Sequence, residues 1–565
     1  MRKVVKLLFP IGVGIVTFAG VLAAQQMTPA ADSGTITVVP SGAAAASSGP
    51  ASPTFSSASL TPTNQVYYVD CGAATNGNGS QNAPWNNVGS VNGKSGGFGP
   101  GDWIMLRRGT ICNGMLAPQG SGSAGAPITI TAYDTTRSAR PIVNGGTNQA
   151  ALKLFNQEYW SIEKIETSGG TPFGIYISGN QSGRVLRDIR VTNVVIHDVG
   201  GTVTNKQTGL LVIAPEVTGT IFDGVVVDGV TAFATTQWAG MRIAGQPPGA
   251  GTGTSAHSRN ITVRNSTVHD TGGEGILLSQ VDNGLIENNV AYNTGQTSVT
   301  NLGSPNGIWT WGCNDCVVQF NEVYNTDSPV SLDGGAFDID YFTNRNTYQY
   351  NYGHDTQGYC VTALGASNYT TTDAVIRYNV CSYNGRGSDL AGQGAIYTYT
   401  WDGGLIDGLK IYNNTIYWDP VIAKSAIINK ATYTGSQDKI FANNIIYSTV
   451  PNMVYNVGSS LLYNNNIYWT TAGATPIWWF NNTSYAGFAA WRAGSGQDAA
   501  GKFLNPFLVT PLSHAAGRPT TAFTLQAGSP AINAGVNVGS MGTRDFYGNV
   551  IPQGGAYDVG AHERQ

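Results

Sequence analysis

Two aspartates separated by one residue, Asp338 and Asp340, are the strongest candidates for chemistry in this sequence. They lie in the segment Gly335-Ala-Phe-Asp-Ile-Asp, where the acids alternate with apolar residues. Such alternation is typical of a β-strand and predicts that both carboxylates share one face. Asp is disfavoured within strands, and two like charges on one face repel each other. We therefore interpret the pair as functional.

The spacing of these aspartates is compatible with hydrolysis of a glycosidic bond. Residues i and i+2 of a strand lie about 6.6 Å apart. Inverting glycosidases hold their two carboxylates about 6.5–9.5 Å apart and retaining ones about 5–5.5 Å. An inverting pair fits, although the reach of the side chains leaves both outcomes open. A crowded or buried carboxylate would have a raised pKa and could act as the general acid.

Further catalytic candidates lie in turns that lead to the same face. They are Asp333, His354, Asp355 and Glu274. His-Asp also occurs at 197–198 and 269–270. A repeated structural role in a turn is therefore the alternative interpretation of His354.

A repeated strand must position these residues. Between about residues 170 and 430 a small residue is followed by an alternating strand eight times, at Gly174, Gly209, Gly240, Gly275, Gly307, Ala336, Gly358 and Ala395. A unit of two or three short strands cannot bury its apolar face alone, but stacked units form a continuous core. The repeat predicts an all-β solenoid of parallel strands.

The alternation also assigns an inner and an outer face to each repeated strand. The outward positions are predicted to be Tyr176/Ser178, Leu211/Ile213, Arg242/Ala244, Leu277/Ser279, Trp309/Trp311, Asp338/Asp340, Cys360/Thr362 and Tyr397/Tyr399. Aromatic rings stack on sugar rings, and polar groups bind hydroxyls. We predict that substrate binds to Trp309, Trp311, Arg242, Tyr397 and Tyr399. The alternative is that a long turn, such as 295–306, covers the tryptophans.

An asparagine recurs before most of these strands, for example at Asn193, Asn265, Asn321 and Asn351. Asparagine tolerates the left-handed backbone conformation, and stacked amides can hydrogen-bond from one coil to the next. Both explanations are structural, so no catalytic role is predicted for these residues.

Motifs at both ends and in the middle of the chain resemble a known superfamily. They are Tyr67-Tyr-Val-Asp with Gly101-Asp-Trp-Ile-Met-Leu-Arg-Arg-Gly, the Gly335 segment with Gln349-Tyr-Asn-Tyr-Gly-His-Asp, and Gly528-Ser-Pro-Ala-Ile-Asn-Ala-Gly with Asp558-Val-Gly-Ala-His-Glu. Over roughly residues 66–558 the chain resembles the right-handed parallel β-helix (pectin lyase-like) superfamily, in particular its bacterial secreted, glycan-active members. The resemblance implies a right-handed parallel β-helix of about ten coils with N-terminal and C-terminal caps. It specifies the reaction poorly, because the superfamily includes lyases, hydrolases and non-catalytic adhesins.

The chain divides by composition into five parts. We predict a signal peptide over residues 1–24 and an Ala/Ser/Pro/Thr-rich linker over residues 25–64. Residues 65–150 are assigned to the N-terminal opening and cap, 151–500 to the β-helix and 501–565 to a C-terminal closing segment. We expect a secreted protein, extracellular or periplasmic, with an uncleaved N-terminal anchor as the alternative.

The cysteine content also fits export. Six cysteines behind a signal peptide are typical of disulfides formed in an oxidising compartment. For the lone Cys313-x-x-Cys316 motif, a disulfide or simple burial is favoured over a metal site.

The net charge argues against nucleic-acid binding. A net charge of −4 gives no polycationic face for nucleic acid. We predict an extracellular polysaccharide-degrading enzyme, a glycoside hydrolase that needs no cofactor. It would be a monomer with a polysaccharide substrate and no membrane contact beyond the signal segment.

Two other functions stay open. One is a Ca²⁺-dependent, pectate lyase-like polysaccharide lyase, with Asp333, Asp338 and Asp340 as the oxygen ligands. Against it, no lysine occupies the outward positions beside Asp338. The other is a non-catalytic, glycan-binding or adhesive β-helix.

Overall fold

The computed structural model describes residues 61–565 except 248–255, 297–301, 304, 329–331, 391, 436–437 and 459–460. The predicted signal peptide and nearly all of the predicted linker lie outside the described residues. The described chain folds into three long β-sheets with two short helices, α1 (Val88–Asn92) and α2 (Phe488–Ser495). None of its helices has the length and apolar character needed to cross a membrane.

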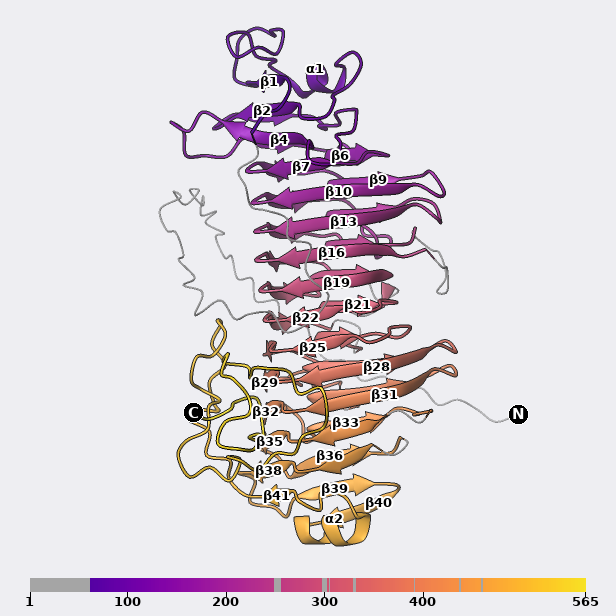
Figure 1. Ribbon diagram of the computed structural model, residues 1–565, viewed down its shortest axis with the longest axis vertical. Helices are drawn as coiled ribbons and strands as arrows, with labels where there is room; N and C mark the ends of the chain where they lie inside the picture. Colours follow the sequence, from indigo (N-terminus) through magenta and orange to yellow (C-terminus); the bar gives the residue numbers. More distant parts are fainter. Residues whose placement is uncertain are drawn as a thin grey trace, which may run out of the picture. The chain divides into compact units, whose positions relative to one another are not determined.

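Each sheet is a stack of strands contributed by successive coils (Figure 1). Sheet 1 consists of β1 (Val66–Val69), β2 (Trp103–Arg107), β4 (Ile128–Tyr133), β7 (Trp160–Glu163), β10 (Val185–Thr192), β13 (Ile221–Asp228), β16 (Ser258–Arg264), β19 (Val281–Glu287), β22 (Val317–Gln319), β25 (Thr347–Gln349), β28 (Thr370–Arg377), β31 (Leu405–Tyr412), β34 (Lys439–Ala442) and β37 (Leu462–Asn464). Sheet 2 consists of β3 (Ile111–Asn113), β5 (Ile142–Asn144), β8 (Glu166–Ser168), β11 (Val195–Val199), β14 (Thr231–Thr235), β17 (Thr267–His269), β20 (Val290–Thr294), β23 (Glu322–Thr326), β26 (Tyr352–His354), β29 (Val380–Ser382), β32 (Thr415–Trp418), β35 (Ile445–Ser448), β38 (Ile467–Thr470) and β41 (Lys502–Phe503). Sheet 3 consists of β6 (Ala150–Phe155), β9 (Phe173–Gly179), β12 (Gly209–Pro215), β15 (Ala239–Ala244), β18 (Ile276–Ser279), β21 (Asn306–Trp311), β24 (Gly335–Ile339), β27 (Val361–Gly365), β30 (Ile396–Thr400), β33 (Ile427–Lys430), β36 (Asn452–Asn456), β39 (Ile477–Phe480) and β40 (Thr483–Ala486).

Neighbouring strands pair in parallel, and among the described strands only β39 and β40 pair antiparallel. The predicted solenoid of parallel strands is confirmed. Sheets 1 and 2 have 14 strands each, more than the roughly ten coils expected. The difference arises because short strands as early as β1 and as late as β41 join the same sheets.

The core fills the interior of the coil with one side chain stacked above another. In sheet 3, Ile276 pairs with Ile308, Ile308 with Phe337, and Phe337 with Val361, and all four are fully buried. Period-two alternation puts these residues inside and the residues between them outside. The alternation seen in the sequence is therefore the cause of the inner and outer faces.

The predicted faces need correction in two coils. Leu211 and Ile213 pair with Ile175 and Ile177, so they belong to the core, and the outward residues of that strand are Val212 and Ala214. In the other coil Cys360 is also in the core, and the outward residues are Thr362 and Leu364. The strand at Gly209 is one residue out of phase with the other repeats, and such a shift exchanges its two faces. The strand at Gly358 keeps the predicted phase, with Val361 inside and Thr362 outside, and only Cys360, which precedes β27, lies in the core.

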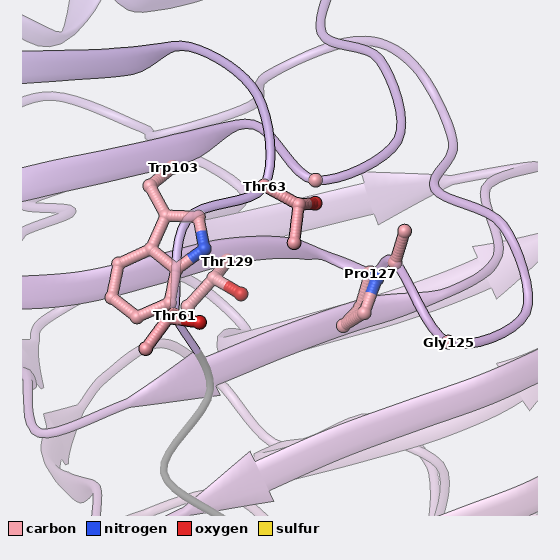
Figure 2. Close-up of a pocket in the computed structure, with 8 residues that line it drawn as sticks. Thr61, Thr63, Trp103, Gly125, Pro127 and Thr129 are labelled. Atoms are coloured by element: carbon pink, nitrogen blue, oxygen red, sulfur yellow. The ribbon is translucent and has the colours of Figure 1, made fainter.

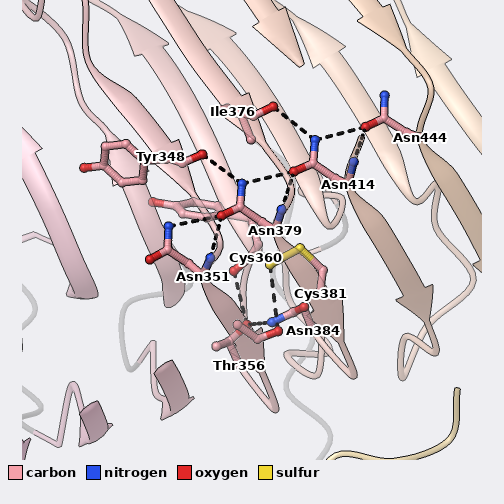
Figure 3. The surroundings of a disulfide bond; sticks show 12 residues. Tyr348, Asn351, Thr356, Cys360, Ile376, Asn379, Cys381, Asn384, Asn414 and Asn444 are labelled. Atoms are coloured by element: carbon pink, nitrogen blue, oxygen red, sulfur yellow. Dashed lines mark hydrogen bonds between the residues drawn. A yellow bond between two sulfur atoms is a disulfide. The ribbon is translucent and has the colours of Figure 1, made fainter. Parts of the chain in front are cut away.

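The recurring asparagines serve two purposes at adjacent positions. Asn193 and Asn265 occupy left-handed turns with φ of 52° and 51°. Asn351 and Asn379 belong to a buried amide ladder instead, in which each Nδ2 donates to the next Oδ1, at 3.0 Å between these two (Figure 3). Its buried members are Asn289, Asn321, Asn351, Asn379, Asn414, Asn444 and Asn466. Both explanations drawn from the sequence are confirmed, each at its own position.

Four of the six cysteines form disulfides. Cys71 pairs with Cys112, and Cys360 with Cys381 beside the amide ladder (Figure 3). Cys313 and Cys316 are free thiols buried in the core. Simple burial is thus the correct interpretation of the Cys-x-x-Cys motif.

Most of residues 504–565 forms irregular structure that packs on sheet 2, where it lies beside β29, β32 and β35 in Figure 1. Polar contacts hold it there. Asn413 Nδ2 donates to the Asp558 carbonyl at 2.8 Å, and the Ala561 N–H donates to Thr415 Oγ1 at 2.8 Å. Buried Phe523 belongs to an apolar cluster shared with Tyr352 of β26.

Candidate functional site

The outer face of sheet 3 brings the predicted acids and aromatic residues together. Strand register places Trp309 of β21 beside Asp338 of β24, and Asp338 beside Thr362 of β27, which in turn pairs with Tyr397 of β30. Aspartates at the centre of this row are therefore flanked by aromatic residues on both sides.

Asp338 is a buried carboxyl, only 1% exposed. Its Oδ2 accepts a hydrogen bond from Asn306 Nδ2 at 2.9 Å, while its buried Oδ1 has no hydrogen-bond partner among the described residues. Burial raises the pKa of Asp338 well above its ordinary value, and the charges of Asp340 and Asp333 raise it further. This carboxyl is therefore held neutral and is shielded from a bound ligand.

Asp340 lies just beyond the end of the same strand and is partly exposed. Its Oδ1 accepts the Tyr341 N–H at 2.8 Å. Burial raises the pKa of Asp340 to about 7, and the charge of Asp333 acts in the same direction. Asp340 can therefore carry a proton near neutral pH and still reach a ligand.

Asp333 approaches the cluster from the turn before β24. It is also partly exposed, and its backbone is left-handed with φ of 52°. Its Oδ1 accepts a hydrogen bond from the Tyr359 hydroxyl at 3.3 Å. The turn and the strand end thus present two accessible carboxylates on either side of buried Asp338.

Tyr359 and Asn306 are site residues that the sequence analysis missed. Tyr359 is fully buried, and its hydroxyl lies 2.8 Å from Asn306 Oδ1 and 3.4 Å from Asp338 Oδ2. Burial and the three acids raise the pKa of Tyr359 well above its ordinary value, so the hydroxyl stays protonated. These two residues fix the positions of the acids, and the only signal in the sequence was their place at the starts of repeated strands.

Lys206 is a further residue that the sequence analysis missed. It lies in the turn before β12, and its charge lowers the pKa values of Asp338, Asp340 and Glu274. Its Nζ lies 5.0 Å from the centroid of the Trp238 ring. The outward strand positions beside Asp338 are occupied by Trp309 and Thr362, but this turn brings the charge of a lysine near the acids, which strand positions alone could not predict.

Glu274 precedes β18 and is fully buried. Its carboxylate accepts a hydrogen bond from Trp238 Nε1, and in the part of the chain that the structure describes its Oε1 has no hydrogen-bond partner. Burial raises the pKa of Glu274 to about 7, opposed by the charges of Lys206 and Arg242. Because β18 lies between β15 and β24 in sheet 3, Glu274 is located between Arg242 and the aspartates.

The predicted aromatic residues belong to a larger group. Trp309 is 9% exposed, and no described residue accepts a hydrogen bond from its Nε1. Trp311 is partly exposed and contacts Tyr341 edge to face at 5.9 Å. On the other side of the acids, Tyr397 and Tyr399 stack at 5.9 Å. Trp401, which the sequence analysis did not single out, stacks on Tyr399 at 5.5 Å and contacts Tyr341 at 5.7 Å. These contacts connect the rings of Trp311, Tyr341, Trp401, Tyr399 and Tyr397 into one surface beside the acids.

The structure does not bring His354 and Asp355 to this cluster. His354 belongs to β26 of sheet 2 and is 1% exposed. Its Nε2 lies 3.0 Å from Glu322 and its Nδ1 2.7 Å from Asp355, which also contacts His514 of the C-terminal segment. Burial opposes protonation of His354, but these hydrogen bonds outweigh it and raise the pKa. The structural interpretation of this His-Asp pair is therefore the one that its placement supports.

The cavity at the start of the β-helix is too small to bind a sugar. The cavity lined by Thr61, Trp103 and Thr129 near the start of the β-helix has a volume of only about 20 Å³ (Figure 2). Within the described residues, no group of three or more His, Cys, Asp or Glu side chains is arranged to hold a metal ion. Calcium binding by Asp333, Asp338 and Asp340 stays a prediction.

Comparison with known proteins agrees with this architecture. A family model described as "Right handed beta helix region" matches residues 223–416. The chain is a right-handed parallel β-helix protein. This is the fold of the pectin lyase-like superfamily, which the sequence motifs resemble.

One curated relative covers most of the chain. It is a lacto-N-biosidase of Bifidobacterium longum subsp. longum, 27% identical over 616 aligned residues that include 90% of this chain. The chain spans 37% of the length of that protein.

Solved β-helix structures are less similar. The native GH136 lacto-N-biosidase from Eubacterium ramulus is 20% identical with a TM-score of 0.46, covering 61% of this chain and 67% of that one. Pectate lyase Pel9A is 16% identical with a TM-score of 0.36, covering 89% of this chain and 97% of that one.

Proposed function

We propose that the protein is an extracellular glycoside hydrolase that cleaves a glycan bound along the outer face of sheet 3. The observation that carries this proposal is the pair of accessible carboxylates, Asp333 and Asp340, at the two ends of β24. Between them the neutral carboxyl of Asp338 supplies no competing charge. Similarity to a lacto-N-biosidase is consistent with this activity.

In the proposed mechanism Asp340 is the general acid. With a pKa of about 7 it donates its proton to the glycosidic oxygen as the bond to the anomeric carbon breaks. Asp333 is the second carboxylate, which either attacks the anomeric carbon or accepts a proton from the attacking water. Tyr359, which donates to Asp333 and contacts the Asn306–Asp338 pair, keeps the two carboxylates in position.

Residues around the two carboxylates would bind the sugar and stabilise the charge that develops. Trp309, Trp311, Tyr397 and Tyr399 provide rings for sugar stacking on both sides of the acids. The positive charge of Lys206 favours the ionised carboxylate that appears when Asp340 gives up its proton.

Lys206 is also the observation that favours a second candidate, a polysaccharide lyase. In that reaction Lys206 would take the proton α to the carboxylate of a uronate residue, and Asp333, Asp338 and Asp340 would hold a cation that neutralises that carboxylate. The glycosidic bond then breaks by elimination and leaves an unsaturated sugar, so the two reactions give different products.

Product analysis distinguishes the candidates. The protein is incubated with plant, microbial and animal glycans, with and without EDTA. We expect new reducing ends without the ultraviolet absorbance of an unsaturated sugar, whether or not EDTA is present.

Asp340→Asn and Asp333→Asn should each lower kcat/KM by about 10²–10⁴-fold. The matched control Asp315→Asn, a 38%-exposed carboxylate paired with Arg345 on a turn, should retain activity. Unsaturated products that EDTA abolishes would contradict hydrolysis, and binding without turnover on every glycan would contradict both reactions.

A further inference from the structure

A cavity of about 110 Å³ lies on the outer face of sheet 3, toward its N-terminal end from the aspartates. It spans β9, β12 and β15 and is lined by Phe173, Tyr176, Asn205, Gln207, Thr208, Val212, Ala214 and Arg242. Row by row, Arg242 pairs with Leu277, Leu277 with Trp309, and Trp309 with Asp338. Three strand spacings therefore separate Arg242 from Asp338, about 14 Å. A group in this cavity belongs to a different part of the ligand from the bond at the aspartates.

The floor of the cavity is apolar. The rings of Phe173 and Tyr176 stack with centroids 4.1 Å apart, and Val212 and Ala214 pack in the same cluster. Asn205, Gln207 and Thr208 form a wall from the turn before β12. An apolar floor with a few polar groups above it is the usual composition of a binding site for a small ligand.

Arg242 is the unusual residue in this lining. It is 6% exposed, its Nη1 has no hydrogen-bond partner, and no salt bridge of Arg242 is found among the residues that the structure describes. Burial lowers its pKa, opposed by the charge of Glu274. A buried cation without a hydrogen-bonded anion is strongly unfavourable, so such groups are normally paired.

Within the described residues, neither acid near Arg242 is hydrogen-bonded to it. Glu274 accepts a hydrogen bond from Trp238, and Glu216 accepts from the Tyr176 hydroxyl at 2.9 Å and from Ser178 Oγ at 3.1 Å. Lys206 adds a second positive charge next to Trp238, in the same turn that forms the cavity wall. Arg242 therefore lines the cavity with a buried guanidinium N–H that no described residue accepts.

We infer that this cavity is a subsite for a sugar that carries an anionic substituent, a carboxylate or a sulfate ester. The anion would bind Arg242 Nη1, the sugar ring would lie on Tyr176 and Val212, and the hydroxyls would meet Asn205 and Gln207. Guanidinium groups match the geometry of such oxyanions. The inference rests on the proposed function, because it treats the cavity and the aspartates as parts of one glycan-binding face.

Direct binding of single sugars tests the subsite. The full chain carrying Asp340→Asn, which should slow turnover, is titrated calorimetrically with galacturonate, glucuronate, N-acetylneuraminate and galactose 6-sulfate. Neutral galactose and N-acetylglucosamine are the reference ligands. We expect at least one acidic sugar to bind ten-fold or more tightly than both neutral ones, and the carboxylate and sulfate arms identify which anion is preferred.

Variants locate the binding. Arg242→Met, which keeps the volume but removes the charge, should weaken binding of the acidic sugar at least ten-fold. The matched control Arg259→Met, at an exposed residue paired with Asp223 on sheet 1, should leave it unchanged. Val212→Trp, which fills the cavity while Arg242 remains, should also abolish binding, so the test does not depend on the folding of one variant.

The outcomes separate this inference from the proposed function. Equal binding of acidic and neutral sugars, or unchanged binding of the acidic sugar by both Arg242→Met and Val212→Trp, would overturn the subsite even if the enzyme hydrolyses glycans. Binding of an acidic sugar that depends on Arg242 would support it even if no hydrolysis is found, because the titration needs no turnover.

Discussion

Three aspartates within eight residues differ in protonation and exposure because their surroundings differ. Asp338 is enclosed and neutral, whereas Asp340 is partly exposed and close to its titration point at neutral pH. Asp333 stands in a turn, where a tyrosine hydroxyl donates to it. Separate protonation states for neighbouring carboxyls are what acid–base catalysis requires. At this scale the burial of each carboxyl decides its role.

The raised pKa of Asp340 makes activity depend on pH. Because the proposed acid must be protonated, kcat/KM should fall as pH rises through about 7. A pH–rate profile of the wild type measures this, with Asp315→Asn as the control that should share the same profile. A flat profile between pH 6 and 8 would contradict the assignment of Asp340 as the acid.

The raised pKa of Asp340 also makes the free energy of unfolding depend on pH. The folded state binds this proton more tightly than the unfolded state, so the free energy of unfolding should fall as pH rises from about 4 to about 7. In Asp340→Asn that fall should be smaller, and above pH 7 the variant should be more stable than the wild type. Thermal unfolding between pH 4 and 8 measures this part of the prediction.

At the scale of the element, the amide ladder ties each coil to the next. Asn379 Nδ2 donates to the Tyr348 carbonyl and to Asn414 Oδ1, while its Oδ1 accepts from both the N–H and the Nδ2 of Asn351. Inside the coil these groups have no access to water, so the ladder satisfies polar atoms that the turns between sheets would otherwise bury alone.

Removal of one amide should therefore be costly. Asn379→Ala leaves several buried donors and acceptors unpaired, and we expect it to lower the free energy of unfolding by about 3–5 kcal/mol. The control Asn464→Ala changes an exposed asparagine on β37 and should alter stability by less than about 0.5 kcal/mol. Denaturant unfolding compares the two, and equal stabilities would show that the ladder does not hold the coils.

At the scale of the whole described chain, the C-terminal segment covers an apolar part of sheet 2. Phe523 is fully buried in the cluster formed with Tyr352, Val380 and Ile445. Without this cover, these side chains of the β-helix would face water. The segment therefore belongs to the folded unit and does not merely follow it.

This packing predicts where the chain becomes vulnerable to proteases. Phe523→Ala should loosen the segment, at a cost of about 3–5 kcal/mol, and speed proteolytic cleavage within residues 504–565. Leu512→Ala, at a residue that is 62% exposed, is the matched control and should be cleaved like the wild type. Cleavage of Phe523→Ala at the wild-type rate would mean that the cluster does not hold the segment.

The local pattern of the sequence determined most of the fold. Period-two alternation after a small residue marked the sheet 3 strands and put Asp338, Trp309 and Tyr397 on the outer face, because strand geometry alone sets which residues share a side. It failed at Leu211, where a shift of one residue reversed the faces, and at Cys360, which lies in the core just before β27 begins. Such a shift is fixed by pairing with the neighbouring coil and not by the strand itself.

The tertiary structure decided the rest of the site. Three other coils contribute Lys206, Asn306 and Tyr359 to the surroundings of the aspartates. The spacing of these residues in the sequence does not predict that they lie near the aspartates. Burial also depends on neighbours distant in sequence, so only the folded chain separates enclosed Asp338 from accessible Asp340 and leaves a guanidinium N–H of Arg242 without a partner. The sequence alone therefore determined the strands and their faces through local geometry. The protonation and accessibility of each carboxyl depended on contacts between coils, which only stacking creates.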